Sequence, residues 1–333
     1  MRWAASAALA MLLGPVALPT CAGADDAASA YQPESRSSGA IRCWGSTQME
    51  DLLRRWQTGF VLSHPQIRFE NHMYGAASAI GGLYARAADL VLSREIWSEE
   101  SQAYAQVKGH APMVFEVATG SFDVPTKSDA LGIFVAVGNP LGHLTLAQLA
   151  AVFTGSAAKV WGDLGLTGTW ASRPIHNYAN LYDNAGMRLF RDLVNAGAPD
   201  WNWETKAFGN LPVAGGGRTD AGQRILDALA ADPDGIAISN PHYASAAVKS
   251  LAIGRGADGP FFPLTRETVR DRNYPLTRGV FLYVDRLDAR LTEFLQYVLS
   301  TAGRADVERE GDYLPLPDFI MARERARLRQ VPR

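Results

Sequence analysis

The sequence predicts an α/β protein, in which short apolar strands alternate with amphipathic helices. Runs such as "ADLVLS" at 88–93, "LGIFVAV" at 131–137 and "GVFLYV" at 279–284 have the length and branched apolar content of buried strands. Between such runs, apolar residues recur with the period of a helix, as at 49–56. This alternation along most of the chain is typical of helices layered on sheets.

The expected elements follow one another in order, and each rests on the same two criteria. A strand is a short apolar run bounded by turn residues, and a helix carries an apolar stripe at i, i+3 and i+4. The expected strands span 40–44, 66–70, 88–93, 113–118, 131–137, 175–179, 235–239 and 279–284. The expected helices span 49–56, 80–87, 145–153, 187–194, 222–231 and 287–299. Three consecutive glycines at 215–217 predict a flexible joint.

The stretch "CWGSTQMEDLLRRW" (43–56) fits both a helix cap and an anion-binding loop. Thr47 and Glu50 match a capping box, in which the Thr hydroxyl and the Glu carboxylate each accept a backbone amide. The glycine turn before the helix also aims free N–H groups at whatever lies above it. The two interpretations are compatible, so the local sequence leaves both open. Thr145 and Gln148 match a second capping box.

The same strand–turn–helix pattern with small residues at the turn occurs three times, at 45–47, 75–78 and 182–186. Each turn can point the amides of a helix N-terminus toward a shared cleft, as an oxyanion receptor requires. A single turn of this kind is more often a plain cap. Three of them in one α/β protein favour a binding site.

The N-terminal residues predict secretion. Residues 1–24 contain one positive charge, a short apolar core and a small-residue exit, which together are typical of a signal peptide. Removal after Ala24 is favoured over lipid attachment at Cys21, because Pro and Thr precede that cysteine. Removal would leave Cys43 as the single cysteine, so no internal disulfide could form. Residues 25–39 are expected to be a flexible leader.

The sequence gives no support for a His-based triad, a metal site, a cofactor or a nucleic-acid surface. Its six histidines are scattered, and the formal net charge is −2. Gly254, Gly256 and Gly259 match the dinucleotide-binding fingerprint in letters, but prolines rather than a helix follow, which indicates a turn. The aromatic stretch "PDWNWETK" (199–206) fits packing of a loop better than sugar stacking.

Six sequence motifs follow one another between Ile41 and Pro317. They are "GST…LLRRW", "AASAIGGLYARAADLVLSRE", "LGIFVAVGNPLGHLTLAQLAAVFTG", "ILDALAADPDGIAISNPHYA", "YPLTRGVFLYV" and "FLQYVLSTAGRADVEREGDYLPLP". In their residues and in their order they resemble the motifs of the PstS-like, phosphate-type periplasmic substrate-binding proteins of ABC transporters. The resemblance implies a type II periplasmic-binding-protein fold, with two α/β lobes joined by a two-segment hinge.

The resemblance also implies boundaries for the lobes. Lobe 1 is expected to comprise 40–130 with 242–317, lobe 2 to comprise 138–236, and the hinge crossovers to lie at 129–138 and 236–243. Residues 318–333 are a basic C-terminal tail, expected to be a solvated helix or a frayed end.

Several ligand positions of the family fall here on residues of another chemical type. Ser46 and Thr47 keep the donors of the first loop, but Ala76 stands where the family has Ser, and Ser78 lies two residues on. Arg94 stands where the family often has an Asp that accepts the proton of hydrogen phosphate. Arg94 is expected either to supply positive charge to the ligand or to form a surface salt bridge with Glu95 or another carboxylate.

In the second lobe, the family's Arg falls on Asn180 and its Ser-Gly-Thr loop falls on 184–186. An Arg and two hydroxyls are therefore missing, although Arg188 lies one helical turn further on. Each lost donor would weaken binding by about 1–3 kcal/mol if the oxyanion kept its place. The predicted ligand-binding residues are Gly45, Ser46, Thr47, Ala76, Ala77, Ser78, Ser93, Arg94, Asn180, Asn184, Ala185, Gly186 and Arg188.

The function that the resemblance implies is binding without catalysis. The chain is expected to be a monomeric periplasmic protein that binds a small anionic ligand, phosphate or another oxyanion, and passes it to a membrane permease or an outer-membrane receptor system. Because several hydrogen-bond donors of the family are replaced in this chain, an organophosphate or a carboxylate stays an alternative ligand. Two alternatives are a ligand-poor sensor or scaffold derived from the family, and a periplasmic hydrolase with Ser46 as nucleophile.

Overall fold

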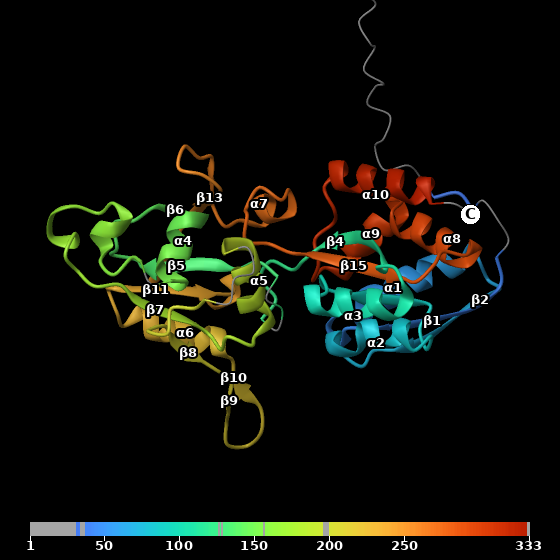
Figure 1. Cartoon of the computed structure of the whole chain (residues 1–333), viewed down its shortest axis with the longest axis horizontal. Coiled ribbons are helices and arrows are strands. Elements are labelled where there is room, and N and C mark those ends of the chain that lie inside the picture. The colour runs from blue at the N-terminus through green and yellow to red at the C-terminus, as the bar shows by residue number, and fades with distance from the viewer. Residues whose placement is uncertain are drawn as a thin grey trace, which may run out of the picture.

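The structure is a computed structural model of two α/β lobes that lie side by side (Figure 1). The predicted signal peptide, with Cys21 and Ala24, lies outside the described residues, as does most of the predicted leader. The two-lobe α/β fold predicted from the sequence is confirmed. The described residues are 31–33, 37–125, 127, 129–155, 157–195 and 200–331.

Lobe 1 is built on a five-stranded sheet in the order β2-β1-β3-β15-β4. Strands β1, β2 and β3 are parallel, and β15 runs antiparallel to both of its neighbours. The strands are β1 (Gly39–Gly45), β2 (Ile67–His72), β3 (Leu90–Ser93), β4 (Met113–Thr119) and β15 (Gly279–Val284). The helices are α1 (Glu50–Val61), α2 (Ala79–Tyr84), α3 (Ser98–Lys108), α8 (Ala289–Val298), α9 (Thr301–Glu310) and α10 (Asp318–Gln330).

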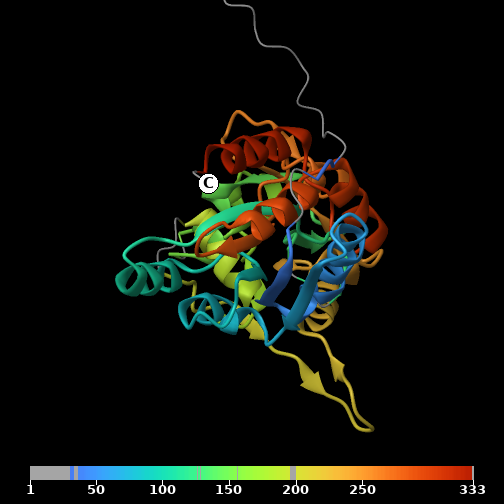
Figure 2. The same ribbon diagram turned by 90° about the vertical axis from the view of Figure 1, so that its right-hand side faces the viewer.

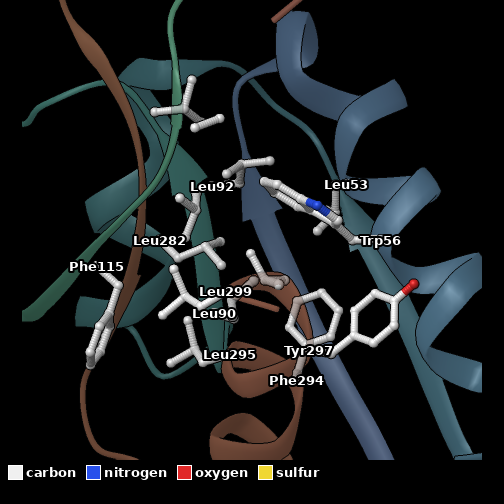
Figure 3. Close-up of a cluster of buried hydrophobic side chains, with 14 of the residues drawn as sticks. Leu53, Trp56, Leu90, Leu92, Phe115, Leu282, Phe294, Leu295, Tyr297 and Leu299 are labelled. Carbon is white, nitrogen blue, oxygen red and sulfur yellow. The ribbon is translucent and has the colours of Figure 1, made fainter. Parts of the chain in front are cut away.

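Alternation along the strands of this sheet sends side chains into two apolar layers. Leu90 and Leu92 of β3 enter the main core with α1, α8, α9 and α10, whereas Val91 enters a smaller cluster with α2 and α3. Figure 3 shows the main core, in which Trp56 of α1 lies near Leu92. The buried indole N–H of Trp56 donates to the carbonyl of Gly303 at 2.9 Å, which ties α1 to α9.

Lobe 2 is built on a second five-stranded sheet, in the order β12-β5-β11-β7-β8. Strand β11 is parallel to β7 and antiparallel to β5. The strands are β5 (Gly132–Ala136), β7 (His176–Asn180), β8 (Lys206–Phe208), β11 (Gly235–Ser239) and β12 (Val248–Ser250). The helices are α4 (Leu146–Phe153), α5 (Ala185–Val194), α6 (Ala221–Ala230) and α7 (Arg266–Arg270).

Two smaller sheets complete the second lobe. One contains β6 (His143–Thr145), β13 (Ala252–Gly254) and β14 (Phe261–Phe262). The glycine-rich segment 254–259 joins β13 to its antiparallel neighbour β14, so the prediction of a turn there is confirmed. The other sheet is a hairpin of β9 (Leu211–Pro212) and β10 (Arg218–Thr219), which protrudes from the molecule in Figure 1 and Figure 2. The glycines at 215–217 form the tip of this hairpin rather than a joint between units.

The chain crosses between the lobes twice, and the two crossings bond to each other. The first crossing lies between β4 and β5, and the second lies between α7 and β15. Leu131 N–H donates to the Leu276 carbonyl at 2.9 Å, and Ala130 and Thr277 form an antiparallel bridge. The lobes are therefore joined by a short antiparallel ribbon rather than by two independent linkers.

The lobe boundaries differ from those predicted. The sequence assigned 242–317 to lobe 1, but β12 pairs with β5 and β13 pairs with β6, so the chain stays in lobe 2 through α7. The predicted crossovers at 129–138 and 236–243 largely coincide with β5 and β11, which are adjacent strands of the second sheet. An apolar run fits a crossover or a sheet strand equally well, because the sequence does not show its pairing partner.

The C-terminal tail is a helix, as one of the two predicted alternatives has it, but this helix packs on lobe 1 instead of being solvated. Residues 318–330 form the helix α10, and its side chains Ile320, Met321 and Leu328 are buried in the main core of lobe 1. The basic residues of the segment masked this apolar stripe in the sequence.

The turn after β1 is capped by a different residue from the one predicted. Ser46 is the N-cap of a short 3-10 turn over Thr47–Met49, and its Oγ accepts the Gln48 amide at 3.4 Å. Helix α1 begins only after this turn, and Glu50 pairs with Arg54 at 2.6 Å instead of reaching back. The capping box at Thr47 is therefore wrong, whereas the one at Thr145 is confirmed.

The position of this cap can be tested by a pair of single substitutions. We expect Ser46→Ala to lower the free energy of unfolding by about 0.5–2 kcal/mol, the usual loss for a cap hydroxyl. We expect a smaller effect for Thr47→Ala, because Thr47 is exposed and does not cap the turn. Urea denaturation measures both values. A larger loss at Thr47 than at Ser46 would place the cap where the sequence predicted it.

Candidate ligand-binding site

The C-terminal edges of the parallel strands in both lobes face the crossings. In lobe 1, Phe281 near the start of β15 pairs with Ser93 at the end of β3, so β3 ends where the chain enters from lobe 2. In lobe 2, Gly132 at the start of β5 pairs with Ser239 at the end of β11. Open α/β sheets bind ligands outside the C-terminal ends of their strands, so these edges are the candidate site.

A cavity of about 90 Å³ opens at this edge of lobe 2. Its walls are the end of β7, the first turn of α5, the first turn of α6 and the residues that follow β11. Three predicted site residues, Asn180, Asn184 and Gly186, line it. The space is large enough for a small ligand or several water molecules.

Two helix N-termini meet at this cavity. Helices α5 and α6 each have 10 residues, and each carries a partial positive charge at its N-terminus. The Asn184 side chain caps α5 by accepting the Gly186 amide at 2.8 Å. Asn210 Oδ1 accepts the Ala221 amide of α6 at 2.8 Å. Convergence of two such ends favours an anion over a cation in this space.

A polar cluster surrounds the start of α6. The Asp220 carboxylate accepts from Arg218 Nε at 2.8 Å and from the Tyr243 hydroxyl at 2.7 Å. Burial, followed by the hydrogen bond to Asp220, raises the pKa of Tyr243 above its usual value. Tyr243 therefore stays a neutral donor at ordinary pH. This cluster was missed in the sequence, where only the apolar part of the strand and the helix carried a recognisable pattern.

The two predicted loops of lobe 1, at 45–47 and 75–78, meet at the opposite edge. Gly75 N–H donates to the Gly45 carbonyl at 2.9 Å, and Ser46 N–H donates to the Leu92 carbonyl at 3.0 Å. A Cβ at Gly45 would lie 2.0 Å from the Leu92 oxygen, so only glycine allows this approach. Ser93 is buried at the end of β3, beside these loops.

The second loop offers few side-chain donors. Ala76 and Ala77 have none, and the Ser78 hydroxyl donates to the Gly75 carbonyl at 2.8 Å. The loops of lobe 1 do not contribute to the cavity lining found among the described residues, which comes from lobe 2 and the first crossing. The structure thus brings the predicted residues together in two groups, one on each facing edge.

Of the two alternatives for Arg94, the structure shows an ion pair with a carboxylate, and the role toward the ligand stays a prediction. It is buried, its guanidinium lies 3.7 Å from the centre of the Trp97 ring, and it pairs with Glu100 at 3.6 Å. It donates to the backbone carbonyl of Glu95, not to its carboxylate. Burial lowers the pKa of Arg94. The predicted ion pair with a nearby carboxylate therefore forms with Glu100 rather than Glu95, and it is largely buried instead of lying on the surface.

Arg188 of α5 faces lobe 1 rather than the cavity. Its guanidinium lies 5.1 Å from the centre of the Trp97 ring, the same ring that Arg94 covers. Ala185, one turn before it on the same face of α5, accepts a hydrogen bond from Arg278 at 2.8 Å. One face of the first turn of α5 thus lines the cavity, and the other contacts lobe 1.

The aromatic stretch before β8 is only partly a packing element. Trp201 is buried against Phe190 and Tyr182, as the packing interpretation predicts. Trp203 is 77% exposed and contacts Tyr182 edge-on. The predicted packing therefore holds for the first tryptophan alone.

Neither a metal site nor a membrane-spanning helix is found in the part of the chain that the structure describes. No cluster of three or more His, Cys, Asp or Glu side chains there could hold a metal ion. No helix there is long and apolar enough to cross a membrane. Cys43 is buried in the core of lobe 1, where burial raises the pKa of its thiol.

Comparison with known proteins places this architecture in a family. A family model described as a PBP superfamily domain matches residues 30–302. The phosphate-binding protein PstS of Pseudomonas aeruginosa is 28% identical over 317 residues, which cover 91% of each chain. The protein SphX of Synechococcus elongatus is 25% identical over 203 residues, covering 59% of this chain and 56% of its own.

Solved structures share the fold at lower identity. PstS from Borrelia burgdorferi is 17% identical with a TM-score of 0.59, covering 84% of this chain and 100% of its own. An ABC-type phosphate transport receptor from Vibrio cholerae is 17% identical with a TM-score of 0.56, covering 83% of this chain and 100% of its own. Since the family model matches most of the sequence, the chain belongs to the PBP superfamily.

Proposed function

We propose that the protein is an exported, non-enzymatic solute-binding protein that holds a small anion between its lobes for an ABC-type membrane permease. The observation that carries the proposal is the convergence of the N-termini of α5 and α6 on one cavity at the edge that faces lobe 1. The relatives named phosphate-binding protein and phosphate transport receptor support the same class of ligand. The protein acts in the periplasm as a monomer.

The ligand lies against α5 and α6 and is covered by the loops of lobe 1 when the lobes close. Asn180, Asn184, Ala185 and Gly186 supply the wall of lobe 2, with Arg188 at its rim. The facing wall consists of Gly45, Ser46, Thr47, Ala76, Ala77, Ser78, Ser93 and Arg94. Closure about a ribbon of two crossings is the common hinge motion of such two-lobe proteins.

Phosphate is the first ligand to test, because the cavity offers donors beyond the predicted site residues. Arg218, Tyr243 and Ser239 line it together with the two helix N-termini. The hydroxyls of Tyr243 and Ser239 already donate to Asp220 and to the Gly222 carbonyl, so the donors left for an anion are the helix ends and the N–H groups of Arg218 other than Nε. Another oxyanion, an organophosphate or a carboxylate would use the same donors.

A hydrolase is the weaker alternative. Ser46, the nucleophile considered for it, is 6% exposed, and its hydroxyl accepts the Gln48 amide. Among the described residues no histidine or carboxylate is recorded in a hydrogen bond with that hydroxyl, and an activated serine needs such a base. A sensor or scaffold with little ligand affinity is the second alternative, motivated by the engagement of Arg94 with Glu100.

Binding is expected to appear directly as added stability. A ligand at a hundred times its dissociation constant should raise the free energy of unfolding by about 2.7 kcal/mol. We expect this rise with phosphate in a thermal-shift screen that also contains sulfate, molybdate, phosphonates, sugar phosphates and carboxylates, confirmed by titration calorimetry. A response to another compound alone would name a different ligand. A flat screen would reject the solute-binding function and favour the sensor or scaffold.

The place of the anion can be tested with Asn180→Asp. Asn180 Oδ1 accepts the Leu181 amide at 2.8 Å, and an Asp oxygen can keep this bond. The substitution replaces a cavity donor by negative charge, so we expect anion binding to weaken by at least about tenfold. Calorimetric titration gives the change. Gln66→Glu is the control, because it adds the same charge at an exposed position before β2 in the other lobe. Equal affinities in the Asn180 and Gln66 variants would remove Asn180 from the site.

A further inference from the structure

Arg278 lies where the two crossings meet. Its N–H donates to the Asp129 carbonyl at 3.0 Å, and its carbonyl accepts the Gly120 amide at 3.0 Å. Its side chain is only 5% exposed. The backbone of Arg278 is therefore bonded to the first crossing at two points, and its side chain is enclosed between the lobes.

The guanidinium of Arg278 reaches both lobes. Nη2 donates to the Ala185 carbonyl at 2.8 Å, in the first turn of α5. Nε lies 3.6 Å from Glu95 Oε1, in the loop between β3 and α3 of lobe 1, and 3.8 Å from Asp129 Oδ1. Since the same turn of α5 lines the cavity through Gly186 and Met187, Arg278 links the site helix to lobe 1.

Among the residues that the structure describes, three buried polar atoms at this junction have no hydrogen-bond partner. They are both carboxylate oxygens of Glu95 and Nε of Arg278. The 3.6 Å between Glu95 and Arg278 exceeds the usual range of about 2.7–3.2 Å for an N–H···O bond. Buried polar groups are normally paired, so a small approach of the Glu95 loop toward Arg278 would satisfy atoms that are now unpaired.

The partners of Arg278 are not equivalent. Asp129 Oδ2 is already held by the Ser121 amide at 3.0 Å and by the Ser121 hydroxyl at 3.2 Å. Asp129 is thus fixed to the first crossing and moves with the ribbon. Glu95 follows β3 of lobe 1 and has no such anchor recorded in the described chain, so its carboxylate is free to close on Nε while Arg278 keeps its bond to Ala185 of lobe 2.

We propose that Arg278 is a positioning residue that couples anion binding at the first turn of α5 to closure of the lobes. This rests on the proposed function. With its bond to Ala185 kept, Arg278 carries α5 and the bound anion toward lobe 1 as Glu95 closes on Nε. The anion then gains the contacts of the lobe 1 loops, and this difference in affinity between open and closed states shifts the population to the closed state.

The test compares Arg278→Gln with wild type by calorimetric titration of inorganic phosphate and by small-angle X-ray scattering. We expect the radius of gyration of wild type to fall when phosphate saturates it. We expect Arg278→Gln to bind phosphate about 5- to 150-fold more weakly, the usual range for coupled sites, and to contract less. Arg266→Gln is the matched control, because Arg266 of lobe 2 donates to the Gly311 carbonyl of lobe 1 at 3.2 Å without touching α5.

Unchanged affinity and unchanged contraction in Arg278→Gln would overturn the coupling, and so would equal losses in Arg266→Gln. If Arg278→Gln does not fold, Glu95→Gln replaces it, since it removes the negative charge that attracts Arg278 to lobe 1 and leaves Asp129 and Ala185 in place. Wild type that binds no anion would overturn the proposed function instead. In that case the radius of gyration of the ligand-free variants still decides whether Arg278 sets the separation of the lobes.

Discussion

The pairing of the two crossings is the constraint on which the rest of the structure depends. Because the crossings bond to each other as an antiparallel ribbon, the first strand of lobe 2 and the last strand of lobe 1 leave the same point in opposite directions. Strand β5 enters its sheet antiparallel to β11, and β15 enters its sheet antiparallel to β3. Each sheet therefore turns the C-terminal ends of its parallel strands toward the other lobe, and the helices that follow begin there.

Much of this arrangement can be predicted from the sequence, because it depends on local pattern. The strands at 88–93 and 279–284 and the capping box at Thr145 are set by apolar periodicity and by short-range hydrogen bonding. The pairing of β12 with β5 could not be predicted in this way, since it joins segments more than a hundred residues apart. For Arg94 the sequence predicts an ion pair with some nearby carboxylate, and the turn between β3 and α3 decides that this carboxylate is Glu100.

The residues of the candidate site also differ in whether the local sequence could predict them. Asn180, Asn184 and Gly186 were found because strand ends and helix starts leave a local pattern in the sequence. Arg218, Asp220 and Tyr243 were missed because they come from three separate segments, and only the tertiary fold brings them to the start of α6. Sequence reasoning therefore finds the backbone elements of an anion site more readily than the side chains that complete it.

The charges on the facing edges of the two lobes indicate whether arginine side chains or helix N-termini attract an anion. Arg94 faces Glu100, Arg218 faces Asp220, and Arg278 lies near Glu95 and Asp129, so each of these guanidiniums has a carboxylate beside it. A guanidinium next to a carboxylate contributes little net field at a distance. The N-termini of α5 and α6 have no such compensation, apart from Asp220, which is itself paired with Arg218. The attraction for an anion therefore comes mainly from the helix ends, which the fold supplies even where the family's side chains have been replaced.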